Sequence, residues 1–142
     1  MSRSTFITTL LIFCFSVVIL LGYISFGVYK IESKMQDNQW FIYENQGVKY
    51  NLKVANTPDQ HRKGLSEITD IPQDYDGMLF AFDEKEVKTF WNYKTHFPLT
   101  VLWMEDFSIV GQSFLPAYDE TVGAKTVTSP QKVNYVIEII EK

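Results

Sequence analysis

Cysteine is almost absent from this sequence of 142 residues, and its single copy, Cys14, lies inside a long apolar stretch near the start. The rest of the chain therefore cannot form an internal disulfide or bind a metal ion through thiolates. Histidine is also scarce, with only His61 and His96. A metal site needs three or four converging ligands, and no carboxylate spacing adjoins either histidine. We therefore expect no metal site and no cofactor.

Several chemical signatures are missing as well. The chain has no glycine-rich loop of the spacing that cradles phosphates, and no GxSxG turn that would expose a nucleophilic serine. Basic residues are outnumbered, because 13 Lys and Arg stand against 17 Asp and Glu, for a net charge of −4. Nucleic-acid binding depends on clustered Lys and Arg, so this balance argues against a nucleic-acid partner.

Charge is absent altogether from residues 5–29, a run of apolar and small polar side chains. A helix of that length reaches roughly 37 Å, which exceeds the ~30 Å hydrocarbon core of a bilayer. A cleavable signal peptide has a shorter apolar region of ~7–15 residues. The sequence therefore predicts that residues 1–29 are an uncleaved transmembrane signal anchor, followed by a polar juxtamembrane linker over residues 30–38.

The orientation of the anchor is not decided by its flanking charges, since Arg3 lies on one side and Lys30 and Lys34 on the other. A first apolar segment near the start of a chain normally sends the following residues across the membrane, and long domains cross largely regardless of charge. We predict a single-pass membrane protein whose globular domain lies on the extracytoplasmic side, in the periplasm or outside the cell.

Residues 39–142 are enough for one hydrophobic core and too few for two. Trp40, Ile42 and the apolar positions of residues 48–54 alternate with polar ones around Asn45-Gln46-Gly47, which predicts a β-hairpin. Thr57 followed by Pro58 is typical of a helix start, and Gly64 is a suitable end, so a short helix is expected there.

Further strands are predicted over five segments, namely residues 77–82, 87–93, 99–105, 107–115 and 132–140. In the last segment Val133, Tyr135, Ile137 and Ile139 alternate with polar positions that include Glu138. Phe90 and Trp103 are expected in the core. The predicted fold class is a β-rich α+β domain of six or seven short, mostly antiparallel strands with one short helix.

Four blocks of the chain, TPDQHRKGLS, GMLFAF, FWNYKTHFPLTVLWMED and SPQKVNYVIEI, together resemble the DUF192 family of small bacterial and archaeal domains. The blocks keep the order and approximate spacing of that family over residues 54–139. The resemblance implies the family's fold, but it implies no reaction, because the family has no established one. Its most specific residues are Arg62, Gly64-Leu65-Ser66, Gly77-Met78-Leu79-Phe80, Phe90-Trp91, Thr95, Pro98-Leu99 and Glu138.

Departures from the family pattern fall in one polar cluster. After Phe-Trp the family typically has Met, then Lys or Arg, then Asn and Thr, whereas here residues 92–95 read Asn, Tyr, Lys and Thr. After Pro-Leu the usual Asp is replaced by Thr100. If this cluster carries the family's activity, the resemblance implies that the activity is altered or lost in this chain.

The segment 90–98 combines aromatic rings, amides, a cation and an imidazole around a predicted loop. Binding sites favour apolar walls with a few placed polar groups. The candidate ligand-binding residues are therefore Trp91, Tyr93, Lys94, Thr95 and His96. We expect a non-enzymatic ligand-binding or envelope accessory module, whose partner is a small molecule, a glycan or a neighbouring envelope protein.

An alternative is a hydrolase in which His96 acts as a general base beside a loop carboxylate, because a near-neutral pKa suits that role. A glycosidase-like carboxylate pair would require two converging acids, and loop carboxylates are more often simply solvated. His61 is expected to be a solvated helix residue. The loop acids in question are Asp74, Asp76, Glu84, Glu86, Asp119 and Glu120.

Overall fold

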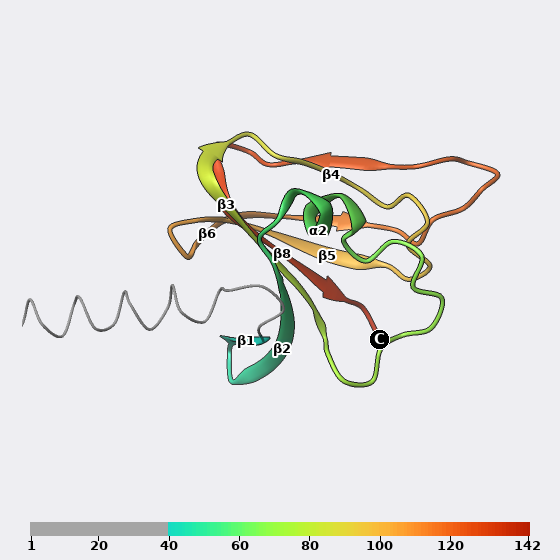
Figure 1. Ribbon diagram of the computed structural model, residues 1–142, viewed down its shortest axis with the longest axis horizontal. Helices are drawn as coiled ribbons and strands as arrows, with labels where there is room; N and C mark the ends of the chain where they lie inside the picture. Colours follow the sequence, from blue (N-terminus) through green and yellow to red (C-terminus); the bar gives the residue numbers. More distant parts are fainter. Residues whose placement is uncertain (1–39) are drawn as a thin grey trace, which may run out of the picture. The chain divides into compact units, whose positions relative to one another are not determined.

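Eight β-strands and one short helix are found in residues 40–142, the part of the chain that the computed structural model describes (Figure 1). The predicted anchor and linker lie outside these residues. Within residues 40–142 no helix is both long and apolar enough to cross a bilayer. The elements are β1 (Trp40–Asn45), β2 (Val48–Ala55), α2 (Pro58–Lys63), β3 (Gly77–Glu86), β4 (Thr89–Trp91), β5 (Leu99–Glu105), β6 (Ser108–Leu115), β7 (Thr126–Thr128) and β8 (Val133–Ile140).

Six of these strands form one sheet in the order β1-β2-β3-β8-β5-β6, and β4 pairs with β7 in a separate two-stranded ribbon. Every neighbouring pair is antiparallel except β2 and β3, which run parallel. A parallel pair needs a crossover connection rather than a tight turn, and this crossover contains α2. The prediction of a β-rich, mostly antiparallel domain with one short helix is confirmed.

The first hairpin forms as predicted, but β1 turns Phe41 and Tyr43 toward the core instead of Trp40 and Ile42. Gln46 and Gly47 have φ of 51° and 80°, and positive φ at both central residues gives the turn that matches strand twist. Phe41 and Tyr43 pack against the sheet. The alternating residues Trp40 and Ile42 face solvent, with 44% and 65% of their surface exposed.

The helix α2 begins and ends as the sequence predicts. The Thr57 hydroxyl accepts a hydrogen bond from the Gln60 backbone N–H, and the Gln60 side chain accepts one from the Thr57 backbone N–H. This reciprocal cap satisfies amides that a helix start leaves unpaired. Gly64 ends the helix with φ of 48°, a conformation that favours glycine.

The predicted strand over residues 87–93 is shorter in the structure, where β4 spans only three residues. Asn92 begins a turn, and the backbone N–H of Thr95 closes it by donating to the Asn92 carbonyl at 3.0 Å. Its partner β7 was not predicted, since three residues are too few to show an alternating pattern. This ribbon brings Phe90 and Val127 onto the main sheet.

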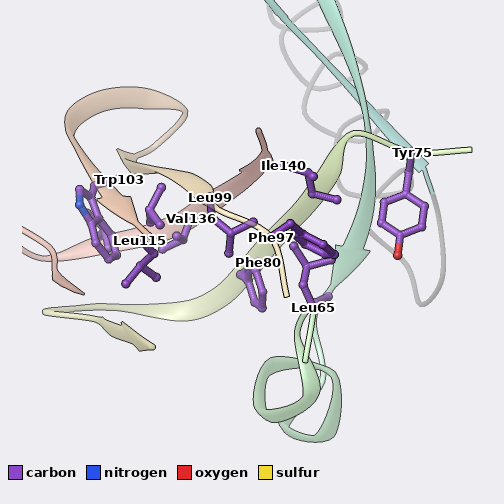
Figure 2. Close-up of a cluster of buried hydrophobic side chains, with 12 residues drawn as sticks. Leu65, Tyr75, Phe80, Phe97, Leu99, Trp103, Leu115, Val136 and Ile140 are labelled. Atoms are coloured by element: carbon purple, nitrogen blue, oxygen red, sulfur yellow. The ribbon is translucent and has the colours of Figure 1, made fainter. Parts of the chain in front are cut away.

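Side chains on both faces of the large sheet are buried. On one face, the residues labelled in Figure 2 extend from Trp103 to Leu65 beside α2, with Tyr75 at the far end. On the other face, Leu52, Leu79 and Ile137 are fully buried. Both faces of β8 are covered, because Val136 and Ile140 pack in the cluster on one face and Ile137 packs in the cluster on the other. The prediction that Glu138 is one of the polar, outward positions of this strand is wrong, because only 3% of its surface is exposed.

Candidate functional site

A small cavity lies where the end of α2, β4 and β8 meet. Its walls include residues 61–66, Phe80, Phe90, Trp91, Thr95 and Glu138, and it offers about 20 Å³ to a water-sized molecule. A cavity needs about 10–15 Å³ by this measure to hold one water. The space therefore fits a single oxygen atom, from a water molecule or from a ligand.

Glu138 is the buried acid of this cavity. It pairs with Met78 of β3 and Val101 of β5, and only 3% of its surface is exposed. Burial raises the pKa of Glu138 to about 8, so the carboxyl is mostly protonated at neutral pH and can donate a hydrogen bond. No side chain or backbone group within residues 40–142 forms a hydrogen bond or ion pair with this carboxyl group. Buried groups with a shifted pKa often mark functional sites.

Thr95 is the second buried polar side chain in the cavity wall, with 3% of its surface exposed. Its backbone is held on both sides, since its N–H donates to the Asn92 carbonyl and its carbonyl accepts from the Tyr118 N–H at 2.7 Å. The Thr95 hydroxyl has no hydrogen-bond partner in the described part of the chain. Two buried polar groups thus share one cavity without pairing with other protein groups.

Asn92 fixes the backbone that carries Thr95. The Asn92 amide donates to the Pro116 carbonyl at 2.8 Å and accepts from the Lys125 N–H at 2.7 Å. Asn92 is one of the residues that depart from the family pattern, and it is 1% exposed. Its role is therefore to tie the 92–95 turn to the 116–125 loop rather than to face a ligand.

His61 lies in the cavity wall and is half-buried, so the expectation of a solvated helix residue is wrong. Its Nε2 lies 3.1 Å from the Ala55 carbonyl oxygen, and its ring packs 4.4 Å from that of Phe82, measured between centroids. A carbonyl can only accept a hydrogen bond, so Nε2 carries a proton and Nδ1 is an acceptor in the neutral ring. The imidazole is thereby held in one orientation beside the cavity.

A wider groove of about 460 Å³ adjoins the cavity, a size suited to a small ligand. Arg62, Lys63, Ser66 and Trp91 line both the groove and the cavity, so the two spaces are neighbours. The remaining groove residues are Asp59, Glu67, Tyr93 and Lys94.

The aromatic wall of the groove consists of Trp91 and Tyr93. They are 52% and 40% exposed, and their ring centroids lie 5.6 Å apart. Large aromatic side chains with this much free surface are the usual platform for stacking a flat or ring-shaped ligand. The Lys94 ammonium lies 5.5 Å from the Tyr93 ring centroid, which adds a cation at the same wall.

The charged groups of the groove leave one cation without a counter-charge. Arg62 lies 3.5 Å from Asp59, and Lys94 lies 3.3 Å from Glu67, whose hydrogen bond raises the pKa of Lys94. Lys63 forms no ion pair with any residue in the described part of the chain. The groove is therefore weakly positive and favours an anionic group on its ligand.

The two walls of the groove are fastened to each other. The backbone N–H of Glu67 donates to the Lys94 carbonyl at 2.9 Å, and the Ser66 hydroxyl donates to the Tyr93 carbonyl at 3.1 Å. The segment after α2 and the turn after β4 therefore hold a fixed spacing. Such preformed geometry is typical of small-molecule sites.

Four of the five predicted site residues come together here. Trp91, Tyr93 and Lys94 line the groove, and Thr95 lines the cavity. His96 is exposed between buried Thr95 and Phe97 and lines neither space. Within residues 40–142 no acidic side chain forms a hydrogen bond or ion pair with it.

Sequence reasoning did not select Arg62, His61 or Glu138 as site residues, although the structure places all three in the cavity wall. The available signal was the family resemblance, since Arg62 and Glu138 are among the residues that carry it. Thr100, another departure from the family pattern, pairs with Ile139. Its side chain therefore lies on the sheet face opposite Glu138, away from the cavity.

Three of the loop acids that were considered for a catalytic pair, Asp76, Glu86 and Asp119, have structural partners instead. Asp76 accepts a hydrogen bond from Lys142 at 2.7 Å, which lowers the pKa of Asp76. Glu86 pairs with Lys88, and Asp119 accepts from Thr121. Across residues 40–142 no three His, Cys, Asp or Glu side chains gather in a way that would hold a metal ion.

Comparisons with known proteins support the resemblance found in the sequence. The family model DUF192, described as an uncharacterized ACR, matches residues 41–142. A Sinorhizobium meliloti 1021 protein, described as a putative transcription regulator, has a similar structure with a TM-score of 0.54 and 28% identity, over 70% of this chain and 76% of that one. A Novosphingobium aromaticivorans DSM 12444 protein of unknown function has a TM-score of 0.58 and 19% identity over 72% of each chain. No protein with a curated description matches.

Proposed function

This chain belongs to the DUF192 family, and we propose that its domain is a non-enzymatic module that binds a small, ring-bearing ligand in the groove beside Trp91 and Tyr93. The observation that carries the proposal is that this groove adjoins a cavity containing the buried, unpaired carboxyl of Glu138. An aromatic wall outside and a placed polar group inside form the combination expected of a specific binding site. Sugars and other small ring compounds suit such a wall.

We further propose that this module works at the extracytoplasmic surface of a membrane, where its ligand is a free small molecule or part of an envelope glycan. Support comes from the uncharged run of residues 5–29 and from the short polar segment that follows it. A linker of about nine residues spans at most roughly 30 Å when extended. The binding groove would therefore act close to the bilayer.

Two other functions have less support. The bacterial relative described as a putative transcription regulator suggests DNA binding, but the acidic balance of this chain lacks the clustered cations that DNA requires. Hydrolysis by His96 would need a carboxylate or a bound substrate beside the imidazole, and His96 lies outside the groove and the cavity.

The binding function is tested by a thermal-shift screen of the full-length protein, purified in detergent, against sugars, sugar acids, nucleosides and aromatic acids. We expect at least one compound to raise the Tm, because a ligand that binds only the folded state stabilises it. Trp91→Ala should abolish this shift. Trp40→Ala is the matched control, since Trp40 is 44% exposed and lines a different pocket. A ligand that binds Trp91→Ala as well as the wild type would refute this site.

A further inference from the structure

Glu138 and Thr95 determine the chemistry of the group that enters the cavity. Only 3% of the surface of each residue is exposed, and both residues line a space with room for one oxygen atom. Within residues 40–142 neither the Glu138 carboxyl group nor the Thr95 hydroxyl has a hydrogen-bond partner. A water in this space can pair with both groups, so a ligand oxygen that replaces it must make the same two hydrogen bonds.

The protonation state of Glu138 selects the type of ligand atom. A neutral carboxyl group has an O–H to donate, and a threonine hydroxyl can donate as well. An ionised Glu138 would instead repel an anion and could only accept hydrogen bonds. The cavity at neutral pH therefore suits an oxygen that accepts two hydrogen bonds.

The charged groups around the cavity favour an anionic acceptor. The titratable side chains that face the cavity come from α2, and they are His61, Arg62 and Lys63. The parts of β3 and β4 that line it contribute Phe80, Phe90 and Trp91, which carry no charge. In the adjoining groove Asp59 and Glu67 are already paired with Arg62 and Lys94, which leaves Lys63 available.

We propose that the ligand carries a carboxylate, with one oxygen inside the cavity accepting hydrogen bonds from Glu138 and Thr95 and the other near Lys63 and Arg62. Its ring lies over Trp91 and Tyr93, so the ligand class is a small cyclic acid such as a sugar acid or an aromatic acid. This inference rests on the proposed binding function and specifies its ligand. Binding is linked to protonation, because loss of the Glu138 proton removes a donor and places two anions together.

The test uses two matched pairs of probes with the full-length protein in detergent, namely glucuronate against glucose and benzoate against benzamide. Calorimetric titration at pH 6, 7, 8 and 9 measures each Kd. We expect at least one acid to bind, and its neutral partner to bind at least about tenfold more weakly. Above the pKa of Glu138, the affinity for the acid should fall by up to about tenfold per pH unit, as one linked proton requires.

Two variants separate this mechanism from a general charge effect. Glu138→Gln keeps a donor in the cavity but cannot ionise, so it should still bind the acid with an affinity independent of pH. Glu120→Gln, which removes an exposed carboxylate outside the site, should keep the wild-type pH dependence. Thr95→Val should weaken binding at every pH.

The outcomes distinguish the ligand class from the binding function. If glucose or benzamide binds as tightly as its acid, the carboxylate inference is wrong and the groove remains a binding site. The same holds if the affinity for the acid does not change between pH 6 and 9. If none of the four probes binds, the ligand class is wrong, and the wider thermal-shift screen then decides the binding function.

Discussion

Replacing Glu138 with glutamine should change how the stability of the domain depends on pH. The pKa of this carboxyl rises from 4.5 to about 8 on folding, so between these values the folded state holds a proton that the unfolded state has lost. Stability therefore falls as pH rises through this window, by about 1.4 kcal/mol per pH unit for this one group. The full effect is of the order of 5 kcal/mol, a large fraction of the stability of a small domain.

Glutamine has nearly the same shape and never ionises, so Glu138→Gln should remove this slope. Any cost of burying the amide is the same at every pH. The difference in unfolding free energy between the variant and the wild type should therefore grow in favour of the variant by about 1.4 kcal/mol per unit between pH 5 and 7.5. Above pH 8 the difference should become constant.

Urea unfolding of both proteins, followed by tryptophan fluorescence at pH 5, 6, 7, 8 and 9, measures this difference. Glu120→Gln is the control and should run parallel to the wild type, because that side chain is exposed. The reasoning is refuted if wild type and Glu138→Gln differ by the same amount at every pH. Glu138 would then titrate as it does in the unfolded chain, with water reaching its charge.

Three further variants test how the site is built. Gly77→Ala should cost more than about 4 kcal/mol or prevent folding, because its Cβ would overlap the Glu138 carbonyl oxygen and separate β3 from β8; near-normal urea unfolding would contradict this. Asn92→Leu should lose at least about 2 kcal/mol in the same assay, since the Lys125 N–H and the Pro116 carbonyl lose their partner; a loss below about 0.5 kcal/mol would mean that these hydrogen bonds matter little. Thr57→Ala should cost about 1 kcal/mol by removing the cap of α2, and Thr57→Ser, which keeps the hydroxyl, should stay close to the wild type.

Local chemistry explains which parts of this fold could be predicted from the sequence. Thr57, Pro58 and Gly64 mark the ends of α2, because a helix cap depends on residues only a few positions apart. The 45–47 turn is equally local, and the structure contains both features. The three-residue β7 was missed because its pairing with β4 depends on residues nearly 40 positions away.

The site was only partly predictable, for a related reason. Trp91, Tyr93, Lys94 and Thr95 are close in sequence and were selected as a group by their composition. Glu138 was expected among the polar positions of its strand, because an acid that alternates with apolar residues usually points to solvent. The structure shows instead that both faces of β8 are buried, with Val136 and Glu138 on one face and Ile137 on the other. His96 shows the converse, since the preceding residue Thr95 lines the cavity while the side chain of His96 is exposed.

The central position of β8 also has a consequence for the order in which function is acquired. Among the described elements β8 is the last to be synthesised, yet it joins β3 to β5 and carries Glu138. Before it docks, the strands β1 to β3 and the hairpin of β5 and β6 have no pairing with each other, and the cavity has no acid. The contacts of β8 with β3 and β5 are distant in sequence, and such contacts form slowly. In our proposal, only a chain that has closed its sheet can hold the ligand, which makes ligand binding a direct report of complete folding.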